Sequence, residues 1–232
     1  MVTASQLQKR TIDNLMKFRT GNQQVACLFN NLSEYGDLIL VGGAIRDYAH
    51  KTLPRDIDII VDSKISNFDE VLDSYCYRRN RFGGYKVFLE NIELDIWGIS
   101  NNWAFRENIL DAKFENISKG SFYNFDSLAL NLKTSYLDAD IFIQAIREKL
   151  LDIIIEDKYI NLNPTPEVNI VRAFIIRKYW ELDFSNRVVD YITKWFSQYN
   201  NPIDILIEAE IKHYGKARLT SEDYHLQLFA DL

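Results

Sequence analysis

The chain has 232 residues, of which 47% are hydrophobic and 26% are charged, and it carries a formal net charge of −6 at pH 7. This composition is ordinary for a globular protein, and the length is enough for one large or two small domains. The acidic balance argues against a general attraction to nucleic acid, and the lack of a long uncharged apolar run argues against a membrane-spanning segment, so we expect a cytoplasmic protein.

The first half of the sequence predicts helices followed by a strand-rich region. Apolar residues recur at helical spacing over residues 3–32, and Thr20-Gly21-Asn22 interrupts them, which predicts two helices. Residues 37–136 then alternate apolar strands with short helices. Within this region we expect a helix at 44–50 and strands at 38–41, from 56 onward, and at 92–97.

After residue 138 the pattern becomes helical. Asn201 followed by Pro202 is typical of a helix cap and a first helical position, and Gly215 is typical of a helix end. The sequence therefore predicts an α+β domain over 1–138 and a helical domain over 139–232. In the helical domain we expect helices at 141–155, 165–180, 185–199 and 202–214, with a short tail from 221.

A glycine pair and a carboxylate pair indicate sites for a phosphate group and a metal ion. Gly42-Gly43 lets the backbone approach a triphosphate, and its amide groups together with the helix start favour an anion. In the following strand Asp56 and Asp58 share one face, roughly 6.6 Å apart at about 3.3 Å per residue, while Ile57 points the other way. Two carboxylates on an open face suit Mg²⁺, which prefers oxygen ligands and keeps coordination sites for water and phosphate.

In-line phosphoryl transfer with two metal ions, about 3.5 to 4 Å apart, requires a third carboxylate. The strand Ile92-Glu-Leu-Asp-Ile-Trp97 supplies Glu93 and Asp95 on one face. Either residue can complete the metal site or orient the attacking hydroxyl. We favour Asp95 as the third metal ligand because its side chain is short and rigid, with Glu93 as the alternative.

Several segments together resemble one enzyme family. They are Val41-Gly-Gly-Ala-Ile-Arg-Asp47, the gap to Asp56-Ile-Asp58, and Val171-Arg-Ala-Phe174 with Leu182 and Phe184. This pattern, over residues 36–185, resembles the head and neck of the poly(A) polymerase and CCA-adding enzyme family of polymerase-β-like nucleotidyltransferases. The resemblance implies a mixed sheet with flanking helices as the catalytic domain, followed by an all-helical neck-like region.

The resemblance also implies roles for individual residues. Gly42, Gly43 and Arg46 would hold the triphosphate, with Asp47 in the same motif. Apart from the resemblance, the position of Arg172 in the neck would let it reach a nucleotide, although an arginine on such a helix is more often solvent-facing or paired. Asp56, Asp58 and the acidic strand would hold two magnesium ions. The implied reaction is a Mg²⁺-dependent transfer of a nucleoside monophosphate from a nucleoside triphosphate to an acceptor hydroxyl, with release of pyrophosphate.

Two stretches depart from the family pattern. Bacterial CCA-adding enzymes carry an Arg-Asp pair in the motif that handles the ribose, and a Glu-Asp-x-x-Arg motif in the neck that reads the base. The corresponding stretches here are Ser121-Phe-Tyr-Asn-Phe-Asp-Ser-Leu128 and Thr165-Pro-Glu-Val-Asn169. The first lacks the Arg-Asp pair, and the second lacks the Glu-Asp-x-x-Arg motif. The family pattern therefore does not predict which nucleotide is used.

The acceptor is predicted from a basic segment. Arg78, Arg79, Arg81 and Lys86 alternate with aromatic rings, a combination that grips phosphates and stacks bases. We expect an RNA acceptor with a tRNA-like 3′ end. A solvated hairpin face with inward tyrosines is an equal interpretation of the segment. Two alternatives stay open for the whole chain: transfer to a small molecule or protein, as in antibiotic-modifying enzymes and toxins, or a catalytically silent nucleotide-binding module. The sequence does not predict the oligomeric state.

Overall fold

The computed structural model of the protein describes residues 3–50, 52–89 and 92–224. They divide into two compact units, the first formed by residues 1–121 and 126–143 and the second by residues 122–125 and 144–232. The domain boundary expected at 138/139 stays a prediction. Within the described ranges, no helix combines the length and apolar character needed to cross a membrane.

Two N-terminal helices begin the first unit, as predicted. Helix α1 (Ala4–Gly21) starts with a capping box, in which the Thr3 side chain accepts from the Gln6 amide and the Gln6 side chain accepts from the Thr3 amide. The side chain of Asn22 accepts a hydrogen bond from the Val25 amide at the start of α2 (Gln23–Ser33). Asn22, the last residue of the triplet that interrupts the apolar pattern, is therefore the N-cap of the second helix.

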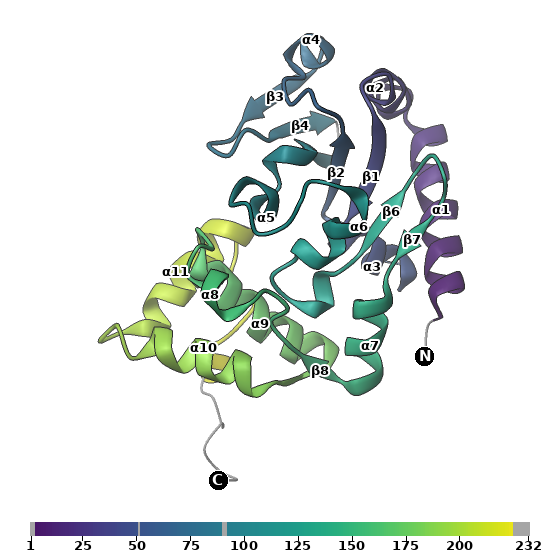
Figure 1. Cartoon of the computed structure of the whole chain (residues 1–232). Helices are drawn as coiled ribbons and strands as arrows, with labels where there is room; N and C mark the ends of the chain where they lie inside the picture. The colour runs from purple at the N-terminus through teal and green to yellow at the C-terminus, as the bar shows by residue number, and fades with distance from the viewer. Residues whose placement is uncertain (1–2, 51, 90–91, 225–232) are drawn as a thin grey trace. The chain divides into compact units, whose positions relative to one another are not determined.

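A seven-stranded mixed sheet forms the centre of the first unit. The strand order is β3-β4-β5-β2-β1-β6-β7, with β3 and β4 at one end and β6 and β7 at the other (Figure 1). Strands β2 and β5 are parallel, and the other neighbouring strands are antiparallel. The strands are β1 (Asp37–Val41), β2 (Asp56–Asp62), β3 (Cys76–Arg79), β4 (Tyr85–Leu89), β5 (Ile92–Gly98), β6 (Ala129–Asn131) and β7 (Leu137–Asp138).

The two faces of the sheet differ in polarity. On one face Ile57, Ile59 and Leu94 are fully buried. Helix α3 (Gly43–Ala49) packs on β1, β2 and α1, and α2 packs on β1 and on α4 (Asp69–Leu72). Burial of this apolar face is the main stabilising contribution to the unit, because removing apolar surface from water dominates folding.

The other face is covered by short helices over part of its length. These helices are η1 (Ile99–Asn101), α5 (Trp103–Arg106), α6 (Phe114–Ile117) and η2 (Ser118–Gly120), and η3 (Asn124–Asp126) follows them. Phe105 and Ile117 pack with Ile39 and Ile60 of the sheet, and Trp97 is packed against the same cluster. Asp56 and Asp58 lie on this face of β2, at the opposite end of the strand from Asp62.

The second unit is helical apart from a pair of two-residue strands. The helix predicted at 141–155 is wrong beyond residue 148, because α7 (Asp140–Glu148) ends where Lys149 adopts a left-handed conformation with φ of 53°. Strand β8 (Leu150–Leu151) then pairs in parallel with β9 (Asp183–Phe184). The remaining elements are α8 (Asp157–Ile160), α9 (Pro166–Trp180), α10 (Asn186–Phe196), α11 (Pro202–Tyr214) and η4 (Ser221–Tyr224).

A buried carboxylate holds the end of the second unit together. Glu210 of α11 is fully buried, and its Oε1 accepts hydrogen bonds from the Arg218 and Leu219 amides at 2.7 and 3.2 Å. The Tyr224 hydroxyl donates to Oε2 of the same residue at 3.0 Å. Because a buried carboxylate needs such donors, Glu210 ties residues 218–224 to α11. The tail predicted from 221 forms a helical turn to residue 224, and its remainder lies outside the described residues.

Candidate active site

The predicted glycine turn joins β1 to α3. Gly42 has φ of 65° and ψ of −132°, a conformation that residues with a Cβ atom rarely adopt, and its amide donates to the carbonyl of Leu128 at 3.1 Å. A Cβ atom added at Gly43 would lie 3.2 Å from Nη2 of Arg46. The Arg46 guanidinium group therefore lies close against the glycine turn, where the sequence pattern predicts a triphosphate.

Arg46 is held there by a residue that the sequence analysis did not single out. Its Nη1 donates to Oδ1 of Asp126 at 3.1 Å, and its Nε lies 3.7 Å from Oδ1 of Asp47. The side chains of Arg46 and Asp126 are largely buried. Asp126 is the one acidic residue in the stretch 121–128. A single acidic residue in an otherwise uncharged stretch was the sequence signal that could have pointed to Asp126. The sequence alone could not identify Arg46 as its partner, because the two residues are brought together only by the fold.

Strand register brings the acidic residues into one row. Val41 of β1 pairs with Asp58 of β2, Asp58 pairs with Asp95 of β5, and Asp95 pairs with Lys86 of β4. Directly paired residues project to the same face of a sheet. Asp58 therefore lies between the strand that leads into the glycine turn and the strand that carries Asp95. Glu93 is placed in the same way, as the register partner of Asp56.

Two basic side chains contact these carboxylates. Arg55 Nη2 lies 2.5 Å from Oδ2 of Asp56. Lys86 Nζ lies 2.7 Å from Oδ2 of Asp95 and 2.9 Å from Oε2 of Glu93. Burial raises the pKa of the Asp95 carboxyl, and the bond from Lys86 opposes that rise. For Lys86 itself, burial favours a lower pKa, but the bonds to both carboxylates outweigh it and the pKa is raised.

The donor set fits a magnesium ion held by few protein ligands. Asp56 and Asp58 are partly exposed and offer carboxylate oxygens on one face. Among residues 3–50, 52–89 and 92–224, no group of three or more His, Cys, Asp or Glu side chains is arranged to hold a metal ion. Mg²⁺ is commonly bound through one or two carboxylates together with water and substrate phosphates. The Asp56 and Asp58 pair is compatible with that mode of binding.

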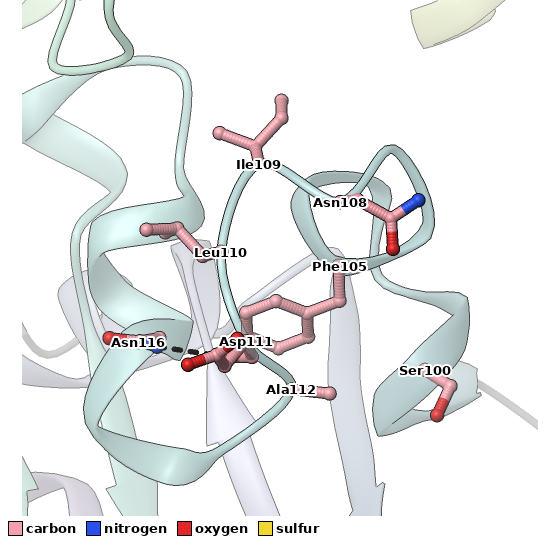
Figure 2. Close-up of a pocket in the computed structure, with 8 residues that line it drawn as sticks. All are labelled: Ser100, Phe105, Asn108, Ile109, Leu110, Asp111, Ala112 and Asn116. Carbon is pink, nitrogen blue, oxygen red and sulfur yellow. Dashed lines mark hydrogen bonds between the residues drawn. The ribbon is translucent and has the colours of Figure 1, made fainter.

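A pocket of about 580 Å³ lies among the short helices that cover the same face of the sheet. Figure 2 shows the Phe105 ring in the centre of the lining, and the Asn116 side chain donates to the Asp111 carbonyl at 3.0 Å. The lining combines apolar and uncharged polar side chains with one acidic residue; its members are Ser100, Phe105, Asn108, Ile109, Leu110, Asp111, Ala112 and Asn116. This volume is in the range of small-molecule sites.

The predicted basic segment forms the β3–β4 hairpin. Arg78, Arg79 and Arg81 are exposed, and each guanidinium carbon lies over an aromatic ring, of Phe88, Tyr85 and Phe82 respectively, at 5.6, 5.2 and 4.6 Å. Lys86 is separated from this set, because its ammonium group contacts Asp95 and Glu93. Tyr85 is buried while the three arginines face solvent, as expected for a solvated hairpin face. Contact of the arginines with nucleic acid stays a prediction.

The last predicted nucleotide-binding residue belongs to the second unit. Arg172 lies in α9 and is partly buried. Its role toward a nucleotide stays a prediction. The stretch 165–169 contains Pro166 at the start of α9 and Asn169 in its first turn. The Asn169 carbonyl accepts a hydrogen bond from the Tyr123 hydroxyl at 3.0 Å.

Solved structures similar to this chain include CCA-adding enzymes and a tRNA-processing enzyme. A Thermotoga maritima CCA-adding enzyme complexed with tRNA aligns with a TM-score of 0.55 and 14% identity, over 84% of this chain and 52% of that chain. A tRNA-processing enzyme with CTP aligns with a TM-score of 0.55 and 16% identity, over 81% of this chain and 56% of that chain. A CCA-adding enzyme with CTP aligns with a TM-score of 0.54 and 15% identity, over 93% of this chain and 55% of that chain.

These similarities establish the fold. They confirm the predicted mixed sheet with flanking helices, which is the architecture of the CCA-adding enzymes. The chain spans little more than half the length of the solved structures described above. No protein-family model matches the sequence, and no curated protein matches it either.

Proposed function

We propose that the chain is a Mg²⁺-dependent nucleotidyltransferase that transfers a nucleoside monophosphate from a nucleoside triphosphate to the 3′ hydroxyl of an RNA. The observation that carries the proposal is the register of β1, β2 and β5, which puts Asp58 beside both the strand entering the Gly42 turn and Asp95. A backbone turn suited to phosphate and carboxylates suited to a divalent ion therefore lie at neighbouring positions of one sheet.

The glycine turn and Arg46 would bind the triphosphate. The conformation of Gly42 leaves the backbone open to an anion, since a Cβ atom added there would meet no other atom within 4 Å. Arg46 lies against Gly43, and its contact with Asp126 restricts the guanidinium group. A restricted arginine loses less conformational entropy when it binds a phosphate than a freely rotating one does.

The carboxylates would bind the metal ion and orient the reacting groups. Asp56 and Asp58 would hold Mg²⁺, which supplies charge neutralisation for the triphosphate and lowers the pKa of the acceptor hydroxyl. In the reaction the acceptor 3′ oxygen forms a bond to the α-phosphorus, the bond from that phosphorus to the bridging oxygen breaks, and pyrophosphate leaves. The protein's contribution to such a reaction is mainly positioning and electrostatic stabilisation.

An RNA acceptor is supported by the β3–β4 hairpin. Arg78, Arg79 and Arg81 are exposed and each lies over an aromatic ring, although the whole chain is acidic. Arg78 projects to the same face of the sheet as Lys86 and Asp95, whereas Arg79 projects to the opposite face. Guanidinium groups on rings can contact phosphates and stack on bases. One similar structure is described as complexed with tRNA and others with CTP or ATP. We therefore propose a tRNA-like 3′ end as the acceptor.

The test is incorporation of labelled nucleotide. Purified protein is incubated with Mg²⁺, each α-labelled nucleoside triphosphate in turn, and total RNA or tRNA transcripts with shortened 3′ ends. We expect label in RNA and release of pyrophosphate. Asp58→Asn should lower the rate by at least about a thousandfold if Asp58 is required for metal binding. Asp62→Asn is the matched control, because it removes a carboxylate from the opposite end of the same strand.

A small-molecule acceptor is the second candidate, and the pocket beside Phe105 favours it. Its volume of about 580 Å³ suits a small ligand, and no lysine or arginine lines it. A neutral or cationic hydroxyl compound would fit that lining better than an anion would. In the same assay, label found only in low-molecular-weight material from a cell extract would support this candidate against RNA. Nucleotide binding without any transfer would instead indicate a silent binding module.

A further inference from the structure

Lys86 occupies a central position among the proposed metal ligands. It is the register partner of Asp95, and its ammonium group bonds to both Asp95 and Glu93, at 2.7 and 2.9 Å. Only 19% of the Lys86 side chain is exposed, and 14% of Asp95. The two carboxylates that the sequence analysis assigned to a third metal-ligand position are thus bridged by a cation of the protein itself.

The Lys86 contacts differ in kind from the other basic contact at the site. Arg55 is the sequence neighbour of Asp56, its side chain is 48% exposed, and it contacts one carboxylate. Such a contact is easily exchanged for solvent or for a metal ion, because exposed ion pairs contribute little free energy. Lys86 comes from a neighbouring strand and satisfies two carboxylates at once. Displacing Lys86 would leave a shielded ammonium group without its acidic partners, which is unfavourable.

We infer that Lys86 is a positioning residue that takes the place of the second metal ion, so that the site holds a single divalent ion on Asp56 and Asp58. This inference rests on the proposed function and makes it more specific. It agrees with the finding that no group of three acidic, histidine or cysteine side chains among the described residues is arranged for a metal. It also replaces the expectation of two magnesium ions with a site of one ion and one fixed ammonium group.

The Lys86 ammonium group changes the charge at the position that a second divalent ion would occupy. A second divalent ion would need the carboxylate of Asp95 or Glu93, and one oxygen of each, Oδ2 of Asp95 and Oε2 of Glu93, already accepts a hydrogen bond from Lys86. The ammonium group brings one positive charge to that side of the row, where an ion would bring two. Occupancy of the site would therefore follow the metal concentration as a single binding event. The positive charge beside Asp95 would be present before any metal ion binds.

The primary test is Mn²⁺ binding to the unmodified protein without nucleotide, followed by electron paramagnetic resonance. We expect about one Mn²⁺ per chain with the spectrum of an isolated ion, because a pair about 3.5 to 4 Å apart would be spin-coupled. Asp58→Asn should abolish that binding. A spin-coupled pair in the unmodified protein would overturn the inference while leaving the proposed function intact. Absence of any bound Mn²⁺ would overturn the inference, while the proposed function would still be decided by the labelled-nucleotide assay.

Substitution of Lys86 provides the second test. Lys86→Met keeps an unbranched side chain, one heavy atom shorter than lysine, and removes its charge. Asp95 and Glu93 then become available, and the stoichiometry should rise to about two ions per chain. Lys86→Arg should restore a stoichiometry of about one, because a guanidinium group can bridge two carboxylates. A role of Lys86 in folding alone would change the thermal midpoint and leave the stoichiometry unchanged, and that result would overturn the inference.

The matched control is Arg78→Met. Arg78 is the register partner of Lys86 on β3, so the substitution removes one positive charge from the adjacent position of the sheet. Its guanidinium group lies over the Phe88 ring, with the guanidinium carbon 5.6 Å from the ring centroid. We expect Arg78→Met to retain one ion per chain. Two ions in this variant as well would show that net charge, not the Lys86 contacts, governs the stoichiometry, and would overturn the inference.

Discussion

Arg46 and Asp126 join the helix after the glycine turn to the segment before β6 through a 3.1 Å ion pair in which both side chains are largely shielded. Removing one partner leaves a poorly solvated charge, so Arg46→Gln or Asp126→Asn should each lower the free energy of unfolding by about 2 kcal/mol. Urea denaturation of both single variants and of the double variant would give a coupling energy of about 1 to 2 kcal/mol.

The exposed pair of Lys133 and Asp37 is the control for that cycle. Its atoms are 2.9 Å apart, but 74% of the Lys133 side chain is exposed. Solvent screening should limit its coupling energy to less than about 1 kcal/mol. Equal coupling energies in the two pairs would contradict the expectation that shielding from solvent strengthens the ion pair between Arg46 and Asp126.

Gly42→Ala tests the need for glycine in the turn. The φ angle of 65° and ψ angle of −132° are unfavourable for alanine even though no atom would collide with the added methyl group. We expect a loss of about 1 to 3 kcal/mol in the free energy of unfolding. Gly21→Ala at the end of α1 also meets no atom, and it should be neutral or stabilising by up to about 1 kcal/mol. Thermal and urea unfolding of both variants would measure the two changes in the free energy of unfolding, and their difference would report the backbone strain at residue 42.

Glu210→Gln tests the buried carboxylate of the second unit. The amide nitrogen of glutamine cannot accept the hydrogen bonds that Arg218, Leu219 and Tyr224 direct at the two oxygens. We expect a loss of about 2 to 3 kcal/mol, measured by urea unfolding with a probe in the second unit. Glu208→Gln on the exposed side of the same helix should change stability by less than about 0.5 kcal/mol. Similar effects of both substitutions would contradict this role for Glu210.

His50 predicts a pH dependence of stability. Burial lowers its pKa below the usual 6.5, the charges of Arg10 and Arg46 lower it further, and Asp47 opposes them. The unfolded chain therefore binds a proton at His50 at a higher pH than the folded chain does. This contribution to stability is fully present above pH 6.5 and is lost as the pH falls through 6.5 toward the folded value.

The measurement for His50 is urea unfolding at about pH 7.5 and pH 5.5. His50→Gln should show a smaller loss of stability between these values than the unmodified protein. The comparison uses the difference between the two pH values, so any constant effect of the substitution cancels. An equal or larger loss in the variant would show that other groups cause the pH dependence.

Local sequence signals predicted most of the elements around the site. The spacing of apolar residues and the two glycines correctly placed β1, α3 and the strand that begins at Asp56, because these features act within a few residues. The alternation in Ile92-Glu-Leu-Asp-Ile-Trp97 likewise predicted β5. Helix α11 has the bounds expected from Pro202 and Gly215, whose backbone preferences are strong.

The contacts between distant segments could not be predicted in the same way. Lys86 belonged to a basic segment in the sequence, and only the antiparallel register of β4 and β5 directs it to Asp95. Asp126 gained its partner through a similar long-range contact. The error at 149–155 has the same origin, because the apolar residues after Lys149 also suit a helix, while pairing with Asp183 and Phe184 selects a strand.

Strand β3 stands at the end of the strand order, so one side of its backbone has no neighbouring strand in the seven-stranded sheet. It is four residues long and includes the exposed Arg78 and Arg79. Short edge strands with positive charges resist pairing with a second chain, since like charges would meet. The arginines proposed to contact RNA would thus also keep the molecule from self-association. Neutral replacements of Arg78 and Arg79 would therefore favour aggregation as well as lower RNA affinity. Lysine replacements would keep the positive charges and the repulsion between chains.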